Sequence, residues 1–319
     1  MKLIIVGGAG YIGSHMVKIA HQAGHDVITI DNLSTGYQDA VLHGEFELCD
    51  ILDTAKLDKL FKKHKPDAVM HFSAYSLVGE SMTNPYKYYN NNVSGTLSLL
   101  KAMIDNDCMK FIFSSSAAIF GNPRYVPIDE NHPKNPINPY GKSKLMVEQI
   151  LEDFELAYGL KYVSFRYFNA AGHDPDGELS ERHDPETHLL PIIMQAANGK
   201  RDSVSIFGND YDTNDGTCVR DYIHVNDLAN AHLKGLDYID QNESSSAEFN
   251  LGNGSGFSVK EVIQQVKEIT GTDFVVIEES RRNGDPSVLI ASDKKVKNEL
   301  GILSNYKGLR SIVKTLIIK

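Results

Sequence analysis

A glycine-rich turn joins an apolar strand to a helix at the start of the chain. Residues 2–6 are apolar and β-branched, residues 11–23 have helical character, and Gly7, Gly10 and Gly13 lie at the junction. Glycines in this context permit a tight turn, a close approach of backbone to a pyrophosphate, and close helix–strand packing. The helix N-terminus directs N–H groups at the anion. The start of the chain therefore predicts a dinucleotide site, although an ordinary strand-to-helix turn would share the pattern.

Asp31 follows a second apolar strand, expected at residues 26–30. An acidic residue about 20 positions after such a turn accepts hydrogen bonds from the ribose hydroxyls and repels a 2′-phosphate. Asp31 therefore favours NAD over NADP. The alternative is a turn residue that simply ends a strand.

Strands and helices alternate along the chain. Strands are expected at 46–49, 67–72, 110–113, 162–168, 203–207 and 274–278, and helices at 54–65, 86–106, 139–157, 189–198 and 259–270. This alternation predicts an α/β fold with a doubly wound, mostly parallel Rossmann sheet and a smaller C-terminal mixed α/β lobe. We expect an NAD-binding domain over 1–168 and a second lobe over 169–319, with part of 218–235 returning to the first. Residues 174–188 are expected to be polar and mobile.

Tyr140 and Lys144 carry the predicted chemistry. Asn138 and Pro139 favour a helix start, which places Tyr140 and Lys144 one turn apart on the same face. A nearby ammonium and a positively charged nicotinamide would lower the pKa of a phenol from about 10. Tyr140 could then take a proton from a substrate hydroxyl, with Ser116 hydrogen-bonded to the same oxygen. The competing interpretation is a helix start with solvated lysines. The predicted buried stripe of this helix is Met146, Ile150, Phe154 and Ala157.

Composition excludes several classes of partner. The net charge of −10 argues against nucleic acid or an anionic membrane as the main partner. Cys49, Cys108 and Cys218 have neither disulfide-framework nor zinc spacing, so we expect buried thiols in a reducing, cytoplasmic compartment. No signal peptide, membrane span or metal is expected. His71 and His224 adjoin apolar strand residues and are expected to be core histidines.

Several motifs together resemble one family: GGAGYIGSH, FSSSAAIFG, NPYGKSK, RYFNAAG and VRDYIHV. They are similar to those of the extended short-chain dehydrogenase/reductase family, and most of all to its nucleotide-sugar C4 epimerases. The resemblance implies epimerisation at C4 of a UDP-hexose (UDP-glucose or UDP-galactose) through a 4-keto sugar, with Tyr140 as general base and acid, and a homodimer through a four-helix contact.

The resemblance also assigns binding residues. NAD would be held by Tyr11, Ile12, Asp31, Asn32, Leu33, Ser34, Thr35, Gly36, Asp50, Ile51, Phe72, Ser73, Ala74, Ser76, Asn91, Lys144 and Phe168. The UDP-sugar would be held by Ser116, Tyr140, Asn169, His188, Leu189, Ser205, Ile206, Phe207, Arg220, the stretch from Arg282 to Asp285, and Leu289.

Arg220 and Arg282 have independent physical support, because a diphosphate in an acidic protein needs local cations. The alternative for each is an ion pair with Asp221 or Asp285. A 4,6-dehydratase is disfavoured because Ala117 and Ala118 stand where elimination needs acids. An epimerase of UDP-N-acetylhexosamines or UDP-pentoses, an ordinary NAD dehydrogenase and a non-catalytic NAD-binding regulatory protein remain alternatives.

Overall fold

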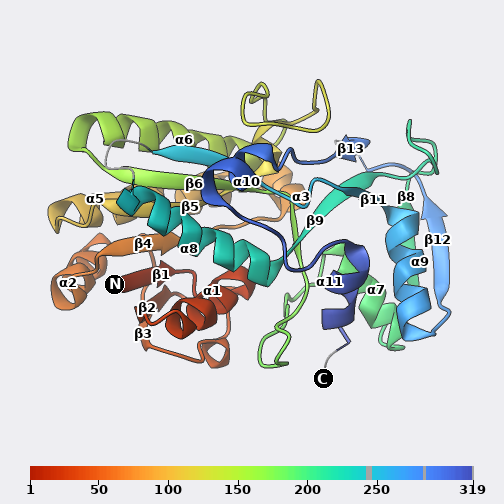
Figure 1. Ribbon diagram of the computed structural model, residues 1–319, viewed down its shortest axis with the longest axis horizontal. Helices are drawn as coiled ribbons and strands as arrows, with labels where there is room; N and C mark the ends of the chain where they lie inside the picture. The colour runs from red at the N-terminus through yellow and green to blue at the C-terminus, as the bar shows by residue number, and fades with distance from the viewer. Residues whose placement is uncertain (242–245, 283–284, 318–319) are drawn as a thin grey trace. The chain divides into compact units, whose positions relative to one another are not determined.

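The computed structural model describes residues 1–241, 246–282 and 285–317 (Figure 1). The chain forms two compact units. The first comprises Met1–Asn122, Pro133–Tyr167 and Ala229–Phe249, and the second comprises Pro123–His132, Phe168–Leu228 and Asn250–Lys319. The returning segment is thus 229–249, and its first residues, 229–235, belong to the stretch 218–235 of which a part was expected to return. The excursion of 123–132 into the second unit has no counterpart in the sequence expectation.

The elements in chain order are as follows. Residues 1–167 contain β1 (Lys2–Val6), α1 (Tyr11–Gln22), β2 (Asp26–Asp31), η1 (Gln38–Ala40), β3 (Glu45–Leu48), α2 (Thr54–His64), β4 (Ala68–His71), α3 (Val78–Thr83), α4 (Pro85–Tyr88), η2 (Tyr89–Gly95), α5 (Thr96–Asp105), β5 (Lys110–Ser116), η3 (Ala117–Ile119), α6 (Pro139–Tyr158) and β6 (Lys161–Tyr167). Then follow β7 (Asn169–Ala171), α7 (Leu189–Ala197), β8 (Ser203–Phe207), β9 (Val219–His224), α8 (Val225–Gln241), β10 (Ala247–Leu251), β11 (Gly256–Ser258), α9 (Val259–Thr270), β12 (Val275–Glu279), β13 (Val288–Leu289), α10 (Lys294–Leu300) and α11 (Leu309–Thr315).

A seven-stranded sheet with the order β10-β6-β5-β4-β1-β2-β3 organises the first unit. Strands β1 to β6 pair in parallel with their neighbours in this order. The chain runs outward from β1 in one direction and from β4 in the other, so the strand order reverses between β1 and β4. Ligands of doubly wound sheets bind beyond the carboxyl ends of the strands at such a switch point. The predicted fold class is confirmed.

Helices cover both faces of this sheet (Figure 1). On one face, α2, α5 and α6 close an apolar core that includes Phe61, Leu100 and Leu151. On the other face lie α1 and α8. There Gly235 of α8 sits so close to the Phe165 ring that an added Cβ would come within 2.8 Å of it. Among the described residues, no helix has the length and apolar character needed to cross a lipid bilayer.

The predicted buried stripe of α6 is only partly right, because Ile150 and Phe154 pack against the core whereas Met146 and Ala157 do not. Met146 is 42% exposed and Ala157 is also exposed, while Ile150 and Phe154 are only partly buried. The buried face instead carries Gly141, Ser143, Lys144, Val147, Glu148 and Leu151. Polar residues occupy this face because it meets the polar end of β5, as described below. The buried apolar positions, Val147 and Leu151, are thus offset by one residue from the predicted Met146 and Ile150.

The second unit is a mixed α/β structure. Strand β9 pairs with β7 and β13 in parallel and with β11 antiparallel, and β8 pairs in parallel with β12. Helices α7, α9 and α11 pack around a separate core that includes Ile193, Val266 and Ile312. Leu179 is buried within the segment 174–188, so this segment is not simply a solvated polar loop.

Candidate active site

The glycine turn lies at the switch point of the sheet. Gly7 has φ +81°, and a Cβ there would lie 2.6 Å from the Ser73 nitrogen at the end of β4. A Cβ on Gly13 would lie 2.0 Å from the Gly7 oxygen, so α1 packs directly on the turn. Gly10 precedes α1 without a capping side chain, and the first turn of α1 holds no acidic residue. These features fit an anionic group such as a dinucleotide pyrophosphate.

Asp31 connects the turn to the end of β2. Its carboxylate accepts hydrogen bonds from the Ala9 nitrogen at 3.0 Å and the Leu33 nitrogen at 2.8 Å. Burial raises the pKa of Asp31, and the Leu33 and Ala9 amides oppose that rise. Next along the edge, the Asn32 amide donates to Asp50 at 2.8 Å. These contacts hold the ends of β2 and β3 beside the turn.

The loop residues predicted for the cofactor are placed along the same edge. Gly36 approaches the backbone of Ala9, because a Cβ there would lie 2.7 Å from the Ala9 carbonyl carbon. Phe72 extends β4, with its nitrogen donating to the Val6 oxygen at 2.7 Å. Gly7, Gly36 and Phe72 therefore lie at one edge of the sheet. Phe168 belongs to the second unit.

A π-helical segment, η2, presents Asn91 and Asn92. Such segments are rare and frequently occur at functional sites. The Asn92 side chain accepts a hydrogen bond from the Tyr75 nitrogen at 2.9 Å and donates to Ser143 of α6 at 3.1 Å. The Asn91 amide in turn donates to Asn92 at 3.0 Å. Asn91 was predicted by resemblance, whereas nothing in the sequence pattern indicated the π-helix.

Tyr140 lies in the first turn of α6, opposite the end of β5. Asn138 caps the helix by accepting from the Gly141 nitrogen at 2.8 Å. A Cβ on Gly141 would lie 2.4 Å from the Ala118 oxygen, so glycine allows α6 to approach the chain after β5. The half-buried Tyr140 side chain hydrogen-bonds Ser116, the last residue of β5. The predicted pair is therefore in contact.

Lys144 is buried one turn further along α6. Its ammonium donates to the Ser114 carbonyl oxygen at 2.6 Å and lies 6.0 Å from the centre of the Tyr140 ring. Burial lowers the pKa of Lys144 to about 7, against the raising effect of Glu148. Burial also raises the pKa of Tyr140, and the Ser116 hydrogen bond offsets part of that rise. The expected lowering of the Tyr140 pKa is thus not found in the chain by itself, because burial outweighs the contribution of its neighbours.

Glu148 and Arg166 support this site and were missed by sequence reasoning. The Glu148 carboxylate receives two hydrogen bonds from Arg166 of β6, both at 2.9 Å, and one from Ser115 at 2.6 Å. Burial alone would raise the pKa of Glu148, but the charge and hydrogen bonds of Arg166 hold it below its ordinary value. The available signal was the spacing, since Tyr140, Lys144 and Glu148 recur every four residues on one face.

In the second unit, the structure brings three predicted substrate residues together. The Arg220 guanidinium lies 3.7 Å from the Asp285 carboxylate, and Arg220 is in register with Leu289 across β9 and β13. The side chain of Tyr222, next but one along β9, hydrogen-bonds Asn169. Arg220 thus lies beside Asp285, one of the two ion-pair partners considered for it. The Asp221 carboxylate instead accepts hydrogen bonds from the backbone nitrogens of Asn253, Gly254 and Ala291.

Other predicted substrate residues form two further groups. The Arg282 guanidinium lies 3.7 Å above the Phe207 ring. The Ser205 hydroxyl donates to Glu279 at 2.6 Å. The Ile206 side chain packs into the apolar core of the second unit. His188 precedes α7, which Leu189 begins. Residues 283 and 284 lie outside the described part of the chain.

The cysteine and core-histidine predictions are confirmed. Cys49, Cys108 and Cys218 are buried and free. His71 is buried against Thr96, at 2.9 Å from its hydroxyl, and burial lowers the pKa of His71 to about 3. His224 is buried and stacks on Tyr306. These groups belong to the protein core.

Known proteins share this architecture. Residues 3–252 match the model of the NAD dependent epimerase/dehydratase family. A UDP-glucose 4-epimerase of Halalkalibacterium halodurans is 49% identical, over 98% of this chain and 93% of its own. UDP-glucose 4-epimerase from Brucella ovis, crystallised in complex with NAD, is 47% identical with a TM-score of 0.96, over 98% and 96% of the two chains. The enzyme from Bifidobacterium longum, in complex with NAD+ and UDP, is 36% identical with a TM-score of 0.94, over 99% and 96%. This chain therefore belongs to the NAD dependent epimerase/dehydratase family.

Proposed function

We propose that the protein is a UDP-glucose 4-epimerase, which interconverts UDP-glucose and UDP-galactose with NAD as cofactor. One observation carries the proposal: the Tyr140 side chain hydrogen-bonds Ser116 at the end of β5, with Lys144 buried one turn away. A phenol, a hydroxyl and an ammonium at the switch point of a dinucleotide-binding sheet suit the oxidation and reduction of a secondary alcohol. A non-catalytic NAD-binding protein would have no use for this arrangement.

The residues at the sheet edge fit the cofactor. Gly7, Gly10 and Gly13 leave room for the pyrophosphate beside α1, and the Asp31 carboxylate suits the adenosine ribose of NAD. When bound, NAD would supply a hydride acceptor for C4 of the sugar and a positive charge. The remaining cofactor contacts are assigned to Tyr11, Ile12, Asn32, Leu33, Ser34, Thr35, Gly36, Asp50, Ile51, Phe72, Ser73, Ala74, Ser76, Asn91, Lys144 and Phe168.

Tyr140 moves the proton in the proposed mechanism. Its phenolate takes the proton of the sugar 4-hydroxyl as that alcohol becomes a ketone, and returns it when the ketone is reduced from the opposite face. Ser116 holds the same oxygen by a hydrogen bond. Because burial raises the pKa of Tyr140, a nearby positive charge is needed to favour the phenolate, and Lys144 supplies one when protonated.

Residues of the second unit are assigned to the UDP-sugar. Arg220 and Arg282 are placed on the diphosphate, because guanidinium groups bind phosphate oxygens in pairs. Asn169, His188, Leu189, Ser205, Phe207, Asp285 and Leu289, with the backbone of Ile206, make up the remaining contacts. A firm hold on the diphosphate and a looser hold on the sugar would let the 4-keto sugar present either face.

We further propose a cytoplasmic homodimer. Leu97 of α5 and Met146 of α6 are large apolar side chains that are 39% and 42% exposed, which supports a helical contact between two copies. The three free buried cysteines suit a reducing compartment.

The direct test is to incubate purified protein with UDP-galactose and no added NAD, and to follow UDP-glucose by chromatography. Turnover without added cofactor is expected, because each cycle regenerates NAD. Net reduction of NAD with UDP-sugar would identify a dehydrogenase instead. Absence of turnover even with added NAD, UDP-N-acetylgalactosamine or a UDP-pentose would contradict an epimerase.

A further inference from the structure

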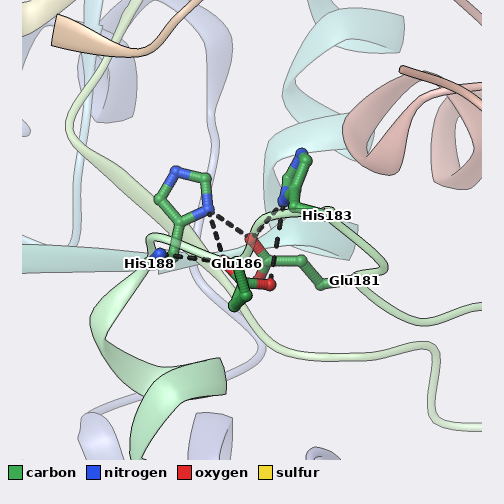
Figure 2. A group of neighbouring side chains, drawn as sticks. All are labelled: Glu181, His183, Glu186 and His188. Carbon is green, nitrogen blue, oxygen red and sulfur yellow. Dashed lines mark hydrogen bonds and ion pairs between the residues drawn. The ribbon is translucent and has the colours of Figure 1, made fainter. Parts of the chain in front are cut away.

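Four ionisable side chains converge between β7 and α7. Glu181, His183, Glu186 and His188 come from eight consecutive residues, with the spacing Glu-x-His-x-x-Glu-x-His (Figure 2). One potential ligand atom from each lies within 4.8 Å of those of the other three. Figure 2 shows both imidazole rings directed at the two carboxylates. The arrangement is therefore a mixed nitrogen and oxygen cluster rather than a group of acids.

The separations suit one small cation. Glu181 Oε1 lies 2.5 Å from His188 Nδ1 and 3.1 Å from His183 Nδ1. Glu186 lies 3.6 Å from His188 Nδ1 and 4.0 Å from His183 Nδ1. Ligand atoms on the corners of a tetrahedral zinc site, with bonds of about 2.0–2.1 Å, stand about 3.3–3.4 Å apart. The observed values bracket that separation.

Both carboxylates of this cluster are buried. The Glu181 side chain is 1% exposed and that of Glu186 is 6% exposed, so two carboxylates share a poorly hydrated place. A divalent cation would compensate the charge of two carboxylates in such a place. The more exposed imidazoles, His183 and His188, leave an approach from solvent.

We propose that Glu181, His183, Glu186 and His188 form a binding site for a divalent transition-metal ion of the zinc type. Two imidazoles and two carboxylates are donors that Zn²⁺ accepts, and four protein ligands complete a tetrahedral shell. A complete shell leaves no open position, so the ion would be structural. It would fix the segment before α7 and the first residues of that helix. This replaces the sequence expectation of no metal, which considered only HExxH and CxxC patterns.

The proposal is tested by isothermal titration of the EDTA-treated, dialysed full-length protein with ZnCl₂. One saturable equivalent is expected, and Zn²⁺ should raise the thermal unfolding midpoint. His183→Gln should weaken Zn²⁺ binding at least about tenfold, since even residues that only support metal ligands contribute that much. Glu47→Gln is the matched control, because Glu47 belongs to another glutamate–histidine group, with Glu45 and His64. Glu47→Gln should leave the affinity for Zn²⁺ unchanged.

Absence of saturable binding to the wild type, or equal binding by His183→Gln, would overturn the proposal in favour of a hydrogen-bonded histidine–glutamate cluster. Circular dichroism establishes whether the variant folds. X-ray absorption of the Zn²⁺-loaded wild type needs no variant. A shell of two imidazole nitrogens and two carboxylate oxygens at about 2.0–2.2 Å supports the site, and a shell dominated by water oxygens contradicts it. These readouts are independent of epimerase activity.

Discussion

Lys144 and Glu148 lie one turn apart on α6, and both side chains are buried against the end of β5. The Lys144 ammonium donates to the Ser114 carbonyl oxygen at 2.6 Å, while the Glu148 carboxylate accepts from the Ser115 hydroxyl at 2.6 Å. Arg166 of β6 completes the arrangement by binding both Glu148 oxygens. The helix that carries Tyr140 is therefore held on the sheet by charge and hydrogen bonding as well as by apolar packing.

Glu148→Gln should destabilise the fold strongly. The substitution leaves the buried Arg166 guanidinium without its carboxylate, which typically costs about 3–5 kcal/mol. Urea unfolding monitored by circular dichroism measures the change. Glu152→Gln, at an exposed position of the same helix, should change the free energy of unfolding by less than about 0.5 kcal/mol. Equal effects of the two substitutions would show that the buried ion pair does not hold α6.

Asp31→Asn should weaken NAD binding about 10- to 100-fold, because it removes a charged hydrogen-bond acceptor at the end of β2. Discrimination against NADP should also fall, since the negative charge that repels a 2′-phosphate is lost. Cofactor retained after gel filtration, and titration of stripped protein with NAD and NADP, measure both effects. Asp26→Asn, at the exposed start of the same strand, is the control and should bind NAD normally. An unchanged ratio of NAD to NADP affinity would remove Asp31 from the cofactor site.

Asp221 should make stability depend on pH. Burial raises the pKa of Asp221 to about 7, although the Asn253, Ala291 and Gly254 amides oppose this. A raised pKa means that the folded protein binds more protons than the unfolded chain between about pH 4 and 7. The contribution of Asp221 to the free energy of unfolding is therefore complete below about pH 4, and it is lost as the pH rises through about 7.

Asp221→Asn removes this titration. The free energy of unfolding of the wild type, minus that of Asp221→Asn, should therefore fall by up to about 4 kcal/mol as the pH rises from 4 to 7. Chemical denaturation at several pH values measures it. A difference that stays constant over this range would mean that Asp221 is ionised in the folded state at every pH tested.

Local rules account for the part of the site that was predicted. The glycine turn, Asp31 and the Tyr140–Lys144 spacing each depend on residues close in sequence, and the alternation of strands and helices brings their positions to one sheet edge. Ser116 could be predicted because the carboxyl end of a parallel strand defines where it lies.

Non-local contacts account for what was missed. Glu148 is buried beside Arg166, on a strand 18 residues away, which binds it through two hydrogen bonds, and Lys134 lies 3.3 Å from it. These contacts place a charged residue on the inner face of α6, where a hydrophobic pattern does not expect one. The π-helical turn at Asn91 and Asn92 is set by contacts with Tyr75 and Ser143, which a linear pattern does not contain.

The central claim is that the Tyr140 phenol carries the proton in the epimerisation. Turnover of UDP-galactose by Tyr140→Phe tests it most directly, with bound NAD quantified in the same sample and Tyr158→Phe, an exposed tyrosine of the same helix, as control. We expect a loss of at least about 100-fold in kcat for Tyr140→Phe, with NAD still bound and Tyr158→Phe fully active. A Tyr140→Phe protein that retains NAD and turns over at a near-normal rate would contradict it.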